Sequence, residues 1–220
     1  MFRRNGLSIV IGALFIALLV GQVFAGERQY NDEREKHGEP ALALRAYLAS
    51  GHFLEATAEN WESEFLQMAA YVFFTVWLFQ RGSAESKSLD EPEEVDRDPR
   101  LARGKRLAEA PWPVRRGGVV LRLYEYSLSI ALFLLFLASF AAHAVGGLRL
   151  HNAEALAHGE PLQTLSDYLS SAQFWFESLQ NWQSEFLAIL SMVVLSIFLR
   201  QRGSPESKPV DAPHSQTGGG

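Results

Sequence analysis

Asn60–Leu66 reads NWESEFL, and Asn181–Leu187 reads NWQSEFL. Each copy stands directly in front of a long apolar run. Shifting the chain by 121 residues aligns residues 5–88 with 126–209 without a gap, and 34 of these 84 positions are identical. The sequence therefore predicts a tandem duplication, in which each copy contributes the same set of elements.

The composition is typical of a membrane protein with water-exposed loops, because uncharged runs rich in Phe and Trp alternate with charge-dense segments. The formal charge of −5 argues against a nucleic-acid binder, which needs a basic face. The chain contains no cysteine, so disulfides, thiolate metal sites and cysteine nucleophiles are excluded.

The apolar runs predict four membrane-spanning helices, at about 7–25, 61–80, 121–145 and 182–200. The 19 residues of the first run, at a rise of about 1.5 Å each, nearly match a hydrocarbon core of roughly 30 Å. A signal peptide is the alternative for this run, since Arg3 and Arg4 precede it. The run aligns with an equally apolar segment that begins at Leu128, far from the N-terminus, and this favours a retained helix.

The predicted fold is an all-α membrane protein with four transmembrane helices, built from two tandem parallel two-helix repeats. Its parts are repeat 1 (1–88), a cytoplasmic linker (89–120), repeat 2 (121–209) and a disordered tail (210–220). Because each repeat has an even number of spans, both copies have the same orientation. Side-by-side packing of the two copies in one chain satisfies this pattern. A dimer in which two chains swap copies satisfies it equally well.

Short amphipathic helices are expected on the outer side, between the two spans of each repeat. Each would follow a His-Gly-Glu-Pro turn and carry one apolar stripe, formed by Leu44, Tyr47 and Leu48 in the first copy and by Leu165, Tyr168 and Leu169 in the second. Apolar stripes beside spans suggest helices that lie in the membrane interface.

The distribution of Lys and Arg predicts the orientation. The N-terminal end, the middle segment 81–125 and the tail together hold 15 of the 20 cationic residues. By the positive-inside rule these three regions lie in the cytoplasm, and both termini are then cytoplasmic.

Glu64 and Glu185 are the most unusual polar residues, because each lies three residues after an interface tryptophan, Trp61 or Trp182. Two carboxylates brought together near a symmetry axis could share a proton or hold a cation. In the simpler interpretation, which we favour, both glutamates are shallow and either accept hydrogen bonds from helix-start amides or pair with Arg28 and Arg149. Asn60 and Asn181 complete the candidate polar site and are expected to cap the second and fourth helices.

Histidines give only weak signals for a metal or cofactor. His37 and His158 each lie two residues before a glutamate, but zinc needs three or four ligands and no further partner is evident. His143 stands at the position of Gln22 and could ligate haem, yet no second intramembrane histidine opposes it. A packed or water-facing histidine is the better interpretation, and we expect no metal, cofactor or catalytic residue.

A resemblance to a known family rests on five motifs: GHF, NWESEFL, FQRGSAESK, PWPVRRGG and RQRGSPESK. Across nearly its whole length the chain resembles an uncharacterised bacterial membrane-protein family known as a domain of unknown function (number 6766). The resemblance implies the bacterial inner (plasma) membrane and carries over no activity and no site residues.

The sequence predicts a polytopic inner-membrane protein without enzymatic activity, structural or interaction-directed. The lipid bilayer is its expected partner, with a second copy of the chain or another membrane protein as the further candidates and no nucleic acid. The alternative is a small channel or transporter in which Glu64 and Glu185 line an outer vestibule.

Overall fold

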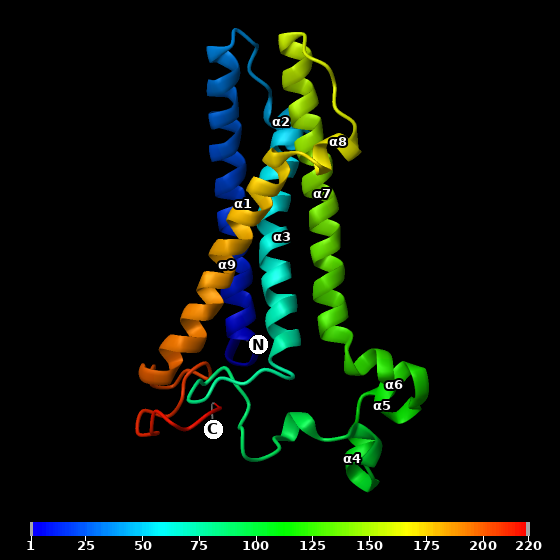
Figure 1. Cartoon of the computed structure of the whole chain (residues 1–220), viewed down its shortest axis with the longest axis vertical. Coiled ribbons are helices and arrows are strands. Elements are labelled where there is room, and N and C mark those ends of the chain that lie inside the picture. The colour runs from blue at the N-terminus through cyan, green and yellow to red at the C-terminus, as the bar shows by residue number, and fades with distance from the viewer. Residues whose placement is uncertain (1, 219–220) are drawn as a thin grey trace. The chain divides into compact units, whose positions relative to one another are not determined.

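The computed structural model describes residues 2–218, and all regular structure within them is helical (Figure 1). The chain divides into two compact units. The first contains Met1–Asn60 and Ser139–Glu177, and the second contains Trp61–Ala138 and Ser178–Gly220.

Four long helices dominate the chain: α1 (Phe2–Lys36), α3 (Gly51–Phe74), α7 (Ser127–His158) and α9 (Ala172–Phe198). Three of them are long and apolar enough to cross a membrane, namely α1 over Arg4–Lys36, α7 and α9. Helix α3 is more polar over residues 51–64, where it carries glutamates at positions 55, 59, 62 and 64.

The helices extend beyond the apolar runs from which the spans were predicted. Helix α1 continues to Lys36, past the predicted end at residue 25, because Gly26 is accommodated within the helix and no proline follows before Pro40. Helix α3 begins at Gly51 rather than at residue 61 and ends at Phe74, so residues 75–80 lie outside it. The polar segments beside the apolar runs are therefore helical as well.

Both short helices form where the apolar stripes predicted them, as α2 (Leu44–Leu48) and α8 (Leu165–Leu169). Their tyrosines, Tyr47 and Tyr168, are fully buried. Helix α8 has a capping box, in which Thr164 Oγ1 accepts a hydrogen bond from the Asp167 backbone N–H and the Asp167 carboxylate accepts from Thr164. These hydrogen bonds lower the pKa of Asp167.

The segments that lead into α2 and α8 are fixed by the same hydrogen bonds at a spacing of 121 residues. Asn31 on α1 donates to Leu42 O and accepts from Leu42 N, and Asn152 on α7 makes the same pair with Gln163. In these bonds one asparagine side chain satisfies both backbone polar groups of a single residue. Each connection therefore returns along its own long helix, which places the following short helix.

Short helices occupy the segment between α3 and α7: η1 (Glu94–Asp96), η2 (Pro99–Leu101), α4 (Gly104–Glu109), α5 (Trp112–Arg116) and α6 (Gly118–Glu125). The ammonium of Lys87 lies 2.6 Å from Asp96 Oδ1. This hydrogen-bonded ion pair is the main reason that the pKa of Asp96 is lowered.

Residues 199–218 follow α9 as a series of turns, in a region where the sequence predicts a disordered tail from residue 210. The buried ammonium of Lys208 donates hydrogen bonds to the carbonyl oxygens of Gly82, Pro213, His214 and Gln216. Burial, with a smaller contribution from Arg200, lowers the pKa of Lys208.

Large apolar side chains on the long helices are exposed. Leu7 and Leu18 on α1 are 78% and 73% exposed, and Leu134 on α7 is 59% exposed. Apolar surface of this extent is unfavourable in water and requires lipid or another protein around it.

Candidate functional site

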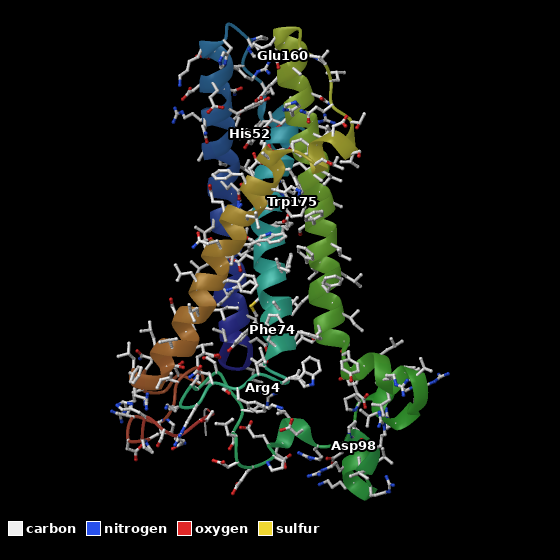
Figure 2. All side chains as sticks on the ribbon, viewed as in Figure 1. Arg4, His52, Phe74, Asp98, Glu160 and Trp175 are labelled. Atoms are coloured by element: carbon white, nitrogen blue, oxygen red, sulfur yellow. The ribbon has the colours of Figure 1, made fainter. Side chains whose placement is uncertain are left out.

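The first unit contains a small core formed by Ala144, Tyr168 and Phe174, from α7, α8 and α9. His143, next to Ala144 on α7, is completely buried, and its ring lies 4.9 Å from the ring of Phe174 between centroids. Trp175 follows on α9 and donates its indole N–H to Leu169 O at 2.9 Å, which ties α9 to the end of α8 (Figure 2). The histidine thus packs against Phe174 on one side.

Glycines bring α3 close to α7 at this core. A Cβ atom on Gly146 would lie 2.5 Å from Glu55 N, and one on Gly51 would lie 2.7 Å from Gly146 O. A Cβ atom on Gly147 would lie 2.0 Å from the Tyr168 hydroxyl. The two helices can therefore pack this closely only because these positions have no side chain.

Three carboxylates surround the buried imidazole. His143 Nε2 lies 3.6 Å from Glu177 Oε2 and 4.0 Å from Glu59 Oε2. One oxygen of Glu55, the His143 nitrogen and one oxygen of Glu177 all lie within 4.8 Å of one another. We call Glu55, Glu59, His143 and Glu177 the His143 cluster; its members come from α3, α7 and α9.

Tyr168 links two members of the His143 cluster. Its hydroxyl group donates to Glu55 Oε1 at 3.2 Å and lies 3.4 Å from Glu177 Oε2. Burial, then the charges of Glu55 and Glu177, raise the pKa of Tyr168, so the hydroxyl stays protonated and remains a donor. Gln173 donates to the other oxygen of Glu177 at 3.1 Å, which fixes that carboxylate further.

The charges of the His143 cluster do not balance, since three carboxylates face one imidazole that carries at most one positive charge. Carboxylates held close together in a partly buried cluster repel one another, and such groups take up protons or bind a cation. The arrangement can therefore hold protons between its carboxylates or coordinate a metal ion.

The residues that the sequence singled out in the second unit lie differently. Glu64 is exposed on α3, and Glu185 on α9 is half-buried, with its backbone carbonyl accepting from Gln67 at 3.1 Å. Trp182 donates its indole N–H to Glu62 Oε1 at 2.8 Å, and Glu62 is fully buried. Trp182 thus binds Glu62, which sequence reasoning passed over.

The prediction that Asn60 and Asn181 cap helices is wrong. Helix α3 begins nine residues before Asn60, at Gly51, and α9 begins nine residues before Asn181, at Ala172. The polar residues ahead of each asparagine continue the helix, so Asn60 donates its amide to Ala56 O one turn earlier.

The remaining candidates lie in the first unit. His37 and His158 have ring centroids 6.3 Å apart, and each donates from Nδ1 to the backbone carbonyl four residues before it. Gln22 donates to Thr57 Oγ1 at 3.2 Å, and Arg28 and Arg149 are exposed.

Sequence reasoning missed Glu55, Glu59 and Glu177 as site residues because it followed what the two copies share, and it placed Tyr168, which recurs as Tyr47, only in an apolar stripe. At the 121-residue spacing Glu55 corresponds to Phe176, and Glu177 corresponds to Ala56. A signal was present, since ionisable residues stand in one copy where the other has an apolar residue.

The fold and the His143 cluster define the class: an all-helical protein with three helices able to cross a membrane and ionisable groups buried among its helices. The chain belongs to the family described as a domain of unknown function (DUF6766), which matches residues 1–219 and confirms the family resemblance of the sequence. No curated protein and no solved structure matches the chain.

Proposed function

We propose that the chain is a polytopic inner-membrane protein of four spans in two tandem parallel repeats, with both termini in the cytoplasm. Its role is structural or interaction-directed rather than enzymatic. In this role the His143 cluster fastens α3, α7 and α9 to one another, and α2 and α8 lie in the outer membrane interface.

The burial of His143 is the observation that carries this proposal. Ionisable groups among membrane helices are costly unless they contact one another, and here the imidazole contacts carboxylates from two other helices. The polar contacts of the cluster thus hold three helices together, as a structural role requires. Asn31 and Asn152 make equivalent hydrogen bonds, each within its own copy, and this supports the two-repeat proposal.

The four-span topology predicts which residues a membrane-impermeant maleimide reaches in intact cells. The chain has no cysteine, so single substitutions give clean labelling sites. We expect Ala41→Cys and Leu162→Cys to be labelled from outside, and Lys105→Cys and Ser215→Cys to be labelled only after the cells are opened. Labelling of positions 41 and 162 from opposite sides of the membrane would contradict the parallel repeats.

Ion flux separates this proposal from the channel alternative. We expect sealed liposomes that contain the wild-type protein to show the same proton and cation flux as empty liposomes, because the polar groups of the cluster contact one another. Flux that the protein causes, and that the double variant Glu64→Gln/Glu185→Gln abolishes at matched reconstitution, would replace the structural role with conduction.

A further inference from the structure

We infer that the His143 cluster binds one divalent first-row transition-metal ion. The ligands are His143 Nε2 and one carboxylate oxygen from each of Glu55 and Glu177, with Glu59 close enough to complete the set. This inference rests on the proposed function, since it names the cation that holds the three helices together at that cluster.

The spacing of the donor atoms fits a metal ion. Ligand atoms about 2.1 Å from a tetrahedral ion lie about 3.4 Å from one another. His143 Nε2 and Glu177 Oε2 are 3.6 Å apart, and the donor atoms of Glu55, His143 and Glu177 lie within 4.8 Å of one another. The atoms are thus at most about 1.4 Å further apart than in such a site, a difference of the size that side-chain rotations produce.

Charge and burial favour a cation at this position. His143 is 0% exposed and Glu55 is 8% exposed, whereas the side chains of Glu59 and Glu177 are each 25% exposed, so water reaches the cluster only in part. A divalent ion with a neutral imidazole would offset two of the three carboxylate charges. The aromatic ring of Phe174 and the buried Ala144 form an apolar layer beside the site, which strengthens such electrostatic attraction.

Tyr168 has the position of an outer partner of a metal site. Its hydroxyl donates to Glu55 Oε1 at 3.2 Å, which fixes that carboxylate, and lies 3.4 Å from Glu177 Oε2. Hydrogen-bond donors that orient ligating carboxylates are a regular part of metal sites. Gly147 leaves the space that Tyr168 and Glu55 need for this contact.

The donor set indicates the kind of metal. One imidazole nitrogen with two or three carboxylate oxygens suits Zn²⁺, Fe²⁺ or Mn²⁺, whereas Cu⁺ prefers sulfur and Mg²⁺ and Ca²⁺ prefer oxygen alone. The sequence does not reveal this set, because Glu55, His143 and Glu177 are 88 and 34 residues apart along the chain.

Calorimetric titration of the full-length, detergent-purified and chelator-stripped protein with Zn²⁺, and separately with Mn²⁺, tests the inference. We expect one tight site per chain. Tyr168→Phe keeps all ligands and should weaken binding roughly 10–100-fold, as the loss of an outer partner does. His143→Gln should weaken it further, and Co²⁺ bound to the wild-type protein should give a ligand-field absorption spectrum that this variant lacks.

The double variant His37→Gln/His158→Gln is the matched control, because it removes two histidines whose rings lie 6.3 Å apart and leaves the cluster intact. It should bind like the wild-type protein. The inference is overturned if the wild-type protein binds no stoichiometric metal. It is also overturned if binding survives His143→Gln and is lost in the control. If metal binding fails while removal of His143 still destabilises the metal-free protein, the fastening role stands; if both fail, both proposals fall.

Discussion

His143→Leu is expected to cause the largest loss of stability of any single substitution considered for this chain. The change leaves the carboxylates of Glu55, Glu59 and Glu177 facing one another without the imidazole. Removing one partner of a buried charged pair costs roughly 3–5 kcal/mol of unfolding free energy. Equilibrium unfolding by SDS in mixed micelles, with a chelator present throughout, measures this loss without any contribution from bound metal.

Gln22→Leu is the matched control for His143→Leu, because Gln22 occupies the corresponding position in the first copy. Its side-chain amide makes one neutral hydrogen bond, to Thr57 Oγ1. Loss of such a bond costs about 0.5–1.5 kcal/mol. Equal losses in the two variants would mean that the charges around His143 contribute nothing beyond ordinary polar packing.

Gly146→Ala is expected to give the second-largest effect. Its new Cβ atom would lie 2.5 Å from the backbone nitrogen of Glu55 and 2.9 Å from its Cα atom. These are backbone atoms, so α3 must move away from α7. Overpacking of this kind costs roughly 1–3 kcal/mol, and the rigid contact favours the upper end of that range. The same SDS titration measures it.

Gly21→Ala provides the comparison for that substitution. Gly21 also lies inside a long helix, but nothing lies within 4 Å of the position that its Cβ atom would occupy. Alanine is better than glycine in a helix by about 0.5–1 kcal/mol, so this variant should be as stable as the wild type or more stable. A Gly146→Ala variant that behaves like Gly21→Ala would show that α3 and α7 do not pack closely at Gly146.

The local elements of the fold were predictable from the sequence because they depend on short-range patterns. An apolar residue at i, i+3 and i+4 places Leu44, Tyr47 and Leu48 on one face, and α2 forms there. The long apolar runs likewise indicate helices able to cross a membrane. The beginning of α3 was less predictable, since Asn60 resembles a cap although the polar residues ahead of it are helical.

The His143 cluster was not predictable in the same way. Its members are neighbours only after α3, α7 and α9 have packed, and that packing depends on the absence of a side chain at Gly146 and Gly147. The comparison of the two copies drew attention to Glu64 and Glu185, which recur. The histidine and the three glutamates of the cluster occur in one copy only, so the duplication gave no reason to select them.

A double-mutant cycle between His143 and Glu177 tests the central claim most directly. The unfolding free energies of His143→Leu, Glu177→Leu and the double variant would be measured in metal-free mixed micelles. Replacing both partners of a buried pair by apolar residues is often nearly neutral. The account therefore predicts that the double variant is far more stable than the sum of the single losses implies, with a coupling of roughly 0.5–3 kcal/mol. If the loss of unfolding free energy in the double variant equals the sum of the two single losses within about 0.5 kcal/mol, the cluster does not hold α7 and α9 together.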